Sequence, residues 1–266
     1  MGSKSDDCIV EEKIEIEIED DGKQISFSNS PSTVQLLQKV IAELIGTYFL
    51  IFAGCGSVVL DKMYGSVSFP GICFTWGLIV MVMIYAVGHI SSAHLNPAVT
   101  ISFTLLGRFP FKDAVFYIIA QLVGSLLASG TLSLLLRPDR RHFYGTVPVG
   151  SSFQSFVFEI IISFLLMFVI SAIATDTRAM RQFAGVVIGS TITLNVFIAE
   201  QVSGASMNPA RSLGPSIVMN NYRGIWIYIF GPTIGAVLGA FAYNLIRFTD
   251  KPLTELTKKK SLRNCF

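Results

Sequence analysis

Two Asn-Pro-Ala boxes carry the most specific chemistry in this chain, one at Asn96-Pro97-Ala98 and the other at Asn208-Pro209-Ala210. Asparagine is a strong helix N-cap and proline is favoured at the first helical position, so the boxes predict helices that begin at Pro97 and Pro209. About ten mostly apolar residues follow each box, which gives helices about 15 Å long, half of the ~30 Å hydrocarbon core of a bilayer. Two half-helices that meet end to end would cross a membrane together, with their positive N-termini facing each other at its centre.

Arg211 follows the second box directly. A guanidinium within an apolar region is costly to bury, and its least costly place is a water-filled path. We therefore expect Arg211 to line a pore, with its donors facing whatever passes. A single Asn-Pro-Ala is also a common turn-to-helix signal without functional content, and it is the second copy that favours the pore.

Glu43 and Glu159 are the only acidic residues within the long apolar stretches of the chain. An intramembrane carboxylate is expensive and requires a reason. One possibility is a proton relay. Their matched placement, one ahead of each box, favours instead a scaffold role in which each accepts hydrogen bonds from the irregular backbone leading into its own box.

The remaining candidate side chains do not form an enzyme site. His89 and His94 flank the first box, but no third ligand is near, so pore lining or backbone bonding is favoured over a metal site. The four cysteines have no metal or redox spacing. Because no nucleophile–base arrangement, phosphate loop or cofactor motif occurs, we predict no catalysis, no cofactor, no metal and no nucleic-acid partner.

The composition indicates a protein that crosses a membrane several times. Hydrophobic residues make up 52% of the chain, charged residues only 14%, and the mean hydropathy is +0.59. Six long apolar stretches lie at Val40–Leu60, Ile72–Val87, Ala114–Leu136, Phe156–Ala174, Phe183–Ala199 and Gly224–Ile246. The boxes fall after the second and fifth, so the order span, span, half-span, span occurs twice. Three spans per repeat require the second repeat to be inverted in the membrane.

The predicted fold is therefore an all-α membrane protein with six transmembrane helices and two re-entrant half-helices. Its channel domain covers residues 38–248, with repeat one at about 38–136 and repeat two at about 154–248. Residues 1–37 hold half of the 18 acidic residues and predict a disordered acidic tail, whereas residues 249–266 predict a basic tail. Most Lys and Arg residues fall on the side that holds both termini, which predicts cytoplasmic termini.

The two boxes, Arg211, the paired glutamates and the stretch Gly88-His89-Ile90-Ser91 resemble the aquaporin superfamily, and within it the plant nodulin-26-like intrinsic proteins. The resemblance runs from about Gln38 to Glu255. It implies a homotetramer with one pore per subunit and a narrow filter outside the asparagine pair. We expect passive permeation of water and small uncharged solutes, exclusion of ions and protons by the two helix N-termini and Arg211, and a plasma-membrane location.

By the family's spacing, the narrow filter falls at Trp76, Val196, Ala205 and Arg211. Trp76 offers an apolar wall, Val196 and Ala205 remove bulk and polarity opposite it, and Arg211 supplies donors. Such an amphipathic ring suits a polyol such as glycerol. The silicic and boric acid channels of the family carry small residues at the Trp76 position, so this sequence resembles the other subgroup.

Two departures from the family pattern stand out. Glu200-Gln201 replaces a usual Gly-Pro pair ahead of the second box, and Ser92 stands at a usual Gly. Both bear on permeation rate, and the first also on selectivity.

Two other functions stay open. Inverted repeats with half-helices are also a secondary-transporter design, although no carboxylate lies at a mid-span position where a coupling ion would bind. The second open function is that of a mainly structural membrane protein with residual water permeability. In the basic tail, Ser261 follows Lys258-Lys259-Lys260 and is a candidate kinase site, although the lysines could equally hold anionic lipid.

Overall fold

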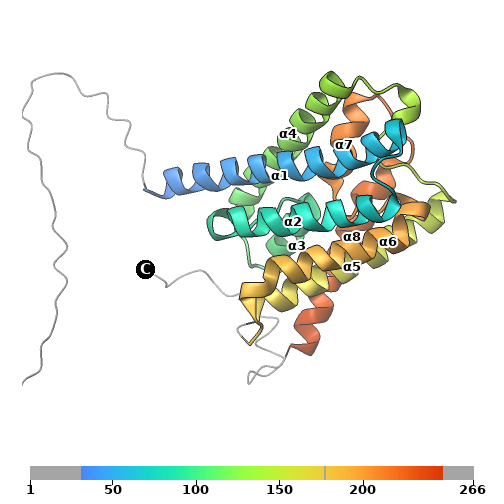
Figure 1. Ribbon diagram of the computed structural model, residues 1–266. Coiled ribbons are helices and arrows are strands. Elements are labelled where there is room, and N and C mark those ends of the chain that lie inside the picture. Colours follow the sequence, from blue (N-terminus) through green and yellow to red (C-terminus); the bar gives the residue numbers. More distant parts are fainter. Residues whose placement is uncertain (1–30, 177, 248–266) are drawn as a thin grey trace, which may run out of the picture.

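The computed structural model describes residues 31–176 and 178–247, and this part of the chain is built from helices alone (Figure 1). The α-helices are α1 (Pro31–Tyr64), α2 (Phe69–Ser91), α3 (Pro97–Leu105), α4 (Phe111–Leu136), α5 (Ser152–Thr175), α6 (Ala184–Ser203), α7 (Pro209–Val218) and α8 (Ile225–Ile246). Two short 3₁₀ turns, η1 (Arg140–His142) and η2 (Arg181–Phe183), precede α5 and α6.

Six of these helices are long and apolar enough to cross a membrane, which confirms the predicted spans. The two short helices, α3 with 9 residues and α7 with 10, begin at Pro97 and Pro209, as the boxes predict. The order span, span, half-span, span therefore occurs in each half of the chain, from α1 to α4 and from α5 to α8.

The start of α1 differs from the sequence prediction. The helix begins at Pro31, so residues 31–37, which we assigned to the acidic tail, are helical. Proline suits a first helical turn, and Val34, Leu36 and Leu37 extend the apolar side of the span by two turns. Residues 1–30 and 248–266 lie outside the described residues, and with them the rest of the predicted acidic tail, the basic tail and Ser261.

The two repeats are interlocked through their half-helices. Within each repeat the first and last spans pack together, α1 on α4 and α5 on α8, and α2 packs on α6 across the repeats. The half-helix α3 of repeat one packs on α8 of repeat two, while α7 of repeat two packs on α4 of repeat one. Each half-helix is thus held by spans of both repeats, which fixes the two boxes relative to each other.

Small residues permit the closest of these contacts. Gly235 and Gly239 of α8 lie against the backbone carbonyls of Ile160 and Phe164 on α5, and a Cβ on either glycine would collide with that carbonyl. Gly124 of α4 lies in the same way against the Leu44 carbonyl of α1. These close backbone contacts pack α8 tightly against α5 and α4 tightly against α1.

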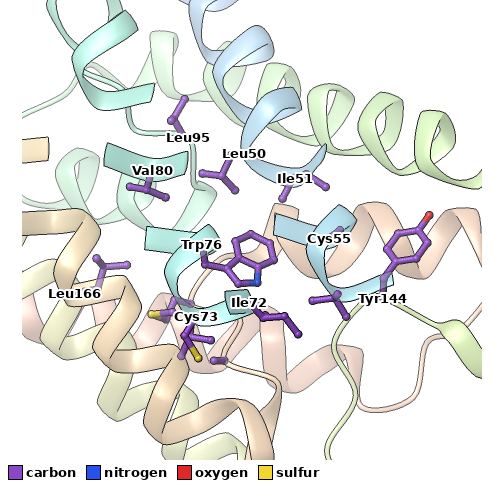
Figure 2. Packing of buried hydrophobic residues seen from close by; sticks show 14 of the residues in the cluster. Leu50, Ile51, Cys55, Ile72, Cys73, Trp76, Val80, Leu95, Tyr144 and Leu166 are labelled. Carbon is purple, nitrogen blue, oxygen red and sulfur yellow. The ribbon is translucent and has the colours of Figure 1, made fainter. Parts of the chain in front are cut away.

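An apolar cluster surrounds Trp76 of α2 (Figure 2). Leu50, Ile51 and Cys55 of α1 and Ile72 and Cys73 of α2 pack around its indole, which is only 5% exposed. A Cβ added at Gly54 would collide with the indole ring, so the glycine leaves the space that the indole occupies. The position of Trp76 is therefore set by the α1 face behind it.

Candidate pore and selectivity filter

The two boxes meet through reciprocal hydrogen bonds between their asparagines. Asn96 Oδ1 accepts from the backbone N of Ala98 at 2.9 Å, and Asn96 Nδ2 donates to the carbonyl of Met207 at 2.8 Å. In the second box, Asn208 Oδ1 accepts from the N of Ala210 and Nδ2 donates to the carbonyl of Leu95, both at 2.9 Å. Each carboxamide therefore caps its own half-helix and holds the opposite loop.

These bonds leave one donor free on each asparagine. An amide nitrogen carries two hydrogens, and the bond to the opposite loop uses one of them. Because Asn96 and Asn208 both line the same cavity, the second hydrogen of each can meet an oxygen within it. The N-termini of α3 and α7 add roughly half a positive charge each at this level.

The loops into the boxes are irregular and are held by the two buried glutamates. Both carboxylates are fully buried. Glu43 accepts from the backbone N of His94 at 2.9 Å and of Leu95 at 2.7 Å, and from Ser91 Oγ at 2.7 Å. Gln121 Nε2 completes its set of donors at 2.8 Å.

Glu159 repeats this arrangement in the second half of the chain. It accepts from the backbone N of Ser206 and of Met207, each at 2.8 Å, and from Ser203 Oγ at 2.7 Å. Leu95 and Met207 both have positive φ, a conformation that is costly for side-chain-bearing residues and must be held by its surroundings. The carboxylates hold Leu95 and Met207 in this conformation by accepting hydrogen bonds from their backbone N–H groups, which is the geometry expected of a scaffold.

The four filter candidates lie together. Trp76, Val196, Ala205 and Arg211 come from α2, α6, the loop before the second box, and α7, and all line one cavity of about 640 Å³ with both box asparagines. The Arg211 guanidinium carbon lies 4.8 Å from the centre of the Trp76 ring, and Arg211 Nη1 has no hydrogen-bond partner in the described residues. The ring thus combines an apolar wall with an unused donor.

The cavity is positive along its length. Its lining in the described part of the chain includes Arg108, Arg181 and Arg211 and contains no carboxylate. With the two half-helix N-termini at its centre, this charge opposes entry of cations. An uncharged solute with hydroxyl groups can accept hydrogen bonds from Asn96, Asn208 and Arg211. Unlike an ion, it does not have to give up the hydration of a charge on entering the cavity.

Comparison with known proteins identifies the fold and the family. The sequence profile of the family described as "Major intrinsic protein" matches residues 30–243. The chain belongs to this family. It is 65% identical over 237 residues to the "Probable aquaporin NIP-type" of Nicotiana alata, covering 89% of this chain and 88% of the relative. It is 56% identical over 238 residues to "Nodulin-26" of Glycine max, covering 89% and 88%.

Among solved structures, the aquaglyceroporin from Plasmodium falciparum has the same fold, with a TM-score of 0.71 over 79% of this chain and 96% of that one, at 24% identity. The nodulin-26-like resemblance and the predicted fold are confirmed. As a major intrinsic protein, the chain is a passive channel for water and small uncharged solutes and an integral membrane protein, in a family of channels and not of enzymes.

Sequence reasoning missed two buried tyrosines of this channel. Tyr117 of α4 donates to the carbonyl of Ser91 at 3.0 Å, and Tyr228 of α8 donates to the carbonyl of Ser203 at 2.6 Å. They hold the same position in the two repeats and support the serines that donate to the glutamates. Aligning repeat two on repeat one would have revealed the pair. Gln121, which bonds Glu43, has no such counterpart.

The two histidines line the cavity, and Ser92 and Glu200, which depart from the family pattern, lie at the ends of α2 and α6. His89 and His94 line the cavity, and His94 Nδ1 lies 3.2 Å from Thr100 Oγ1; no group of metal-ligating residues occurs in the described residues. Ser92 is the C-cap of α2 with a φ of 68°, a conformation that glycine adopts more easily. Glu200, near the end of α6, is close enough to Arg211 for their charges to interact, and its Oε2 is buried without a partner in the described residues.

Proposed function

We propose that this channel conducts glycerol-sized polyols as well as water, and that Trp76, Val196, Ala205 and Arg211 are its selectivity filter. The observation that carries the proposal is the ring itself, in which one indole and two small side chains line the cavity together with an arginine whose side chain makes no hydrogen bond within the described residues. A polyol has one carbon face and several hydroxyls. Its carbons would lie against Trp76 while its hydroxyls accept from Arg211.

Beyond the filter, the solute would form its next hydrogen bonds with the asparagine pair. The free Nδ2 hydrogens of Asn96 and Asn208 would donate to the oxygen of each passing molecule. A water held by two donors has both lone pairs engaged and cannot accept a proton from its neighbour along the chain. Together with the half-helix N-termini, this would interrupt a proton wire and exclude hydronium.

Secondary transport is a poorer explanation of the same geometry. A coupling ion needs an available carboxylate near the midplane. Both oxygens of Glu43 and of Glu159 already accept hydrogen bonds from the box loops, and no carboxylate lines the cavity within the described residues. A scaffold role for both glutamates is therefore part of the proposal, and a proton relay is not.

We also propose a homotetramer in the plasma membrane, with both termini cytoplasmic and Ser261 accessible to a protein kinase. Large apolar side chains on the outer faces of the spans, such as Phe74, Leu78 and Val82 on α2, offer surface for neighbouring subunits and lipid. The sequence Lys258-Lys259-Lys260-Ser261 is the basis for the kinase and lipid proposals.

Stopped-flow light scattering on proteoliposomes tests the substrate proposal. An inward glycerol gradient should give re-swelling well above that of protein-free vesicles, without saturation in the millimolar range and without dependence on a sodium or proton gradient. Water permeability measured in sucrose serves as the matched readout. Water flux without glycerol flux would reject the filter assignment, and saturable, gradient-coupled uptake would favour a transporter.

A further inference from the structure

The cavity continues beyond the box asparagines to a second end, away from the filter. Trp76 and His89 both line it from α2, and they are about 20 Å apart along the helix axis at 1.5 Å per residue. At the far end, called here the basic vestibule, Arg108, Phe109, Arg181 and Gln182 line the cavity together with His89. Arg108 and Phe109 come from the α3–α4 loop, and Arg181 and Gln182 from η2.

Arg108 is a partly buried cation without a carboxylate partner in the described residues. Its Nη2 donates to Oδ1 of Asn244 on α8, whereas Nη1 is buried and has no hydrogen-bond partner among the residues that the structure describes. Burial and the neighbouring Arg247 charge lower the pKa of Arg108. A guanidinium that lines the cavity in this position gains from an anion in the cavity, because the negative charge offsets the repulsion between the arginines.

The nearby carboxylate is already engaged elsewhere. Asp176, the C-cap of α5, accepts from Arg178 at 2.7 Å and from Tyr243 at 3.0 Å, and Arg247 lies 4.0 Å from it. Arg181 is exposed, and its side chain makes no hydrogen bond or ion pair with the rest of the described chain. Two of the cavity-lining arginines are therefore without a counter-charge in this part of the structure.

An apolar surface adjoins these two cations. Phe109 lines the cavity beside Arg108, and its ring packs on Tyr117 at 4.6 Å and on His94 at 4.8 Å, so its position is fixed. Phe103 and Ile170 continue the apolar lining. A ligand suited to the basic vestibule therefore has one anionic end and a short hydrocarbon end.

We propose that the basic vestibule binds a small organic carboxylate anion, with its carboxylate between Arg108 and Arg181 and its carbons against Phe109. A carboxylate presents two oxygens to a guanidinium fork, which is the geometry that arginine recognises best. The bound anion lies in the path of the permeating solute. Occupancy of this site thus reduces solute flux, which adds an inhibitory ligand to the proposed channel function.

Propanoate is the probe, and propanamide, its uncharged isostere, is the matched control. Binding is measured first, as the rise in thermal unfolding midpoint of the purified full-length protein with sodium propanoate, against propanamide plus sodium chloride at equal ionic strength. This readout does not depend on channel activity. Glycerol and water fluxes are then measured in proteoliposomes at pH 7.5 with the same additions on both faces.

Propanoate should raise the unfolding midpoint and slow both fluxes, while propanamide should do neither. Arg108→Gln and Arg181→Gln should each raise the half-effective propanoate concentration about tenfold, because each removes one charge-assisted contact. Arg140→Gln, an exposed arginine of η1 at the opposite end, should leave that concentration unchanged. Arg181→Gln keeps the test valid if Arg108→Gln, which loses its bond to Asn244, does not fold.

Equal effects of propanoate and propanamide, or an unchanged half-effective concentration in Arg181→Gln, would overturn the proposal. A channel that conducts no glycerol but still binds propanoate in the unfolding assay would reject the polyol assignment and leave the anion site standing.

Discussion

The guanidinium carbon of Arg211 lies 4.8 Å from the centre of the Trp76 ring, so the charged residue of the proposed filter lies over its aromatic residue. A cation over an indole face is attracted by about 0.5–2 kcal/mol, which holds the guanidinium to one side of the cavity. If these residues form the filter as proposed, the position of Trp76 sets both the width of the ring and the direction of the Arg211 donors. Substitutions at two places should therefore alter the proposed filter: at Gly54, behind the indole, and at Val196 and Ala205, on the opposite side of the ring.

Gly54→Ala changes the surface behind Trp76. A Cβ at this position would collide with the indole, which must move toward the cavity and narrow it. We expect glycerol permeability to fall several-fold and water permeability to fall less, because water is the smaller solute. Stopped-flow measurement of both solutes in the same vesicles gives the ratio.

Gly130→Ala on α4 is the matched control, since no atom of the described residues lies within 4 Å of its Cβ position. It should leave both permeabilities unchanged and slightly favour the helix. A Gly54→Ala channel with the wild-type ratio of glycerol to water permeability would show that Trp76 does not set the width of the filter.

Glu43→Gln should damage the first box without creating a pH-dependent phenotype. Glu43 accepts four hydrogen bonds, two of them from backbone N–H groups, and the glutamine amide would place donors against donors. Each buried donor left without an acceptor costs about 1–3 kcal/mol. We expect a clearly lower thermal unfolding midpoint in detergent and low flux of both water and glycerol.

Asp113→Asn, in the first turn of α4, is the control and should keep the unfolding midpoint close to that of the wild type. A Glu43→Gln protein with unchanged stability that loses only a proton current would instead support the relay role.

The sequence predicted the parts of this site that depend on neighbouring residues. The helix starts at Pro97 and Pro209 follow from local capping chemistry, and the structure confirms both. The bonds from Gln121 to Glu43 and from Tyr228 to Ser203 join different helices, and no local pattern marks them. The Trp76–Arg211 contact depends on how α7 packs against α2, so the residue types were predictable and their distance was not.

The start of α1 shows a different limit. Hydropathy places the span where apolar residues become continuous, near Val40, whereas the helix begins at Pro31. Residues 31–37 mix polar and apolar side chains, so a continuous apolar run does not reveal these turns, although their apolar residues extend one side of the span.

Asn208→Asp should weaken ion exclusion. Aspartate keeps an oxygen to accept from Ala210 and caps the helix, but it loses the Nδ2 donor to Leu95 and the free donor in the cavity. It also adds a negative charge between two positive helix ends, which lowers the barrier to cations. We expect no detectable proton or sodium conductance in the wild type and a measurable one in the variant, recorded in proteoliposomes under a clamped potential with a pH-sensitive dye for protons and a sodium-sensitive dye for sodium.

Asn221→Asp, in the turn before α8, adds the same charge outside the cavity lining and should conduct no ions. A wild-type proton current comparable in size to the solute flux would contradict the exclusion mechanism.

The double substitution Val196→His and Ala205→Cys tests the central claim most directly, because it fills the space opposite Trp76 that a polyol needs in order to lie against the indole. It would narrow the ring opposite Trp76, add polar groups there, and keep the carbons of the polyol from lying against the indole. Losing apolar contact for three carbons, at about 0.8 kcal/mol per CH₂, could raise the glycerol barrier by about 2 kcal/mol, a slowing of more than tenfold. Water can exchange its hydrogen bonds with the imidazole.

The measurement is the ratio of glycerol to water permeability in proteoliposomes of equal protein content. We predict that this ratio falls at least about tenfold in the double variant while water permeability stays within a few-fold of the wild type. An unchanged ratio in a correctly inserted double variant would contradict the assignment of selectivity to these four residues.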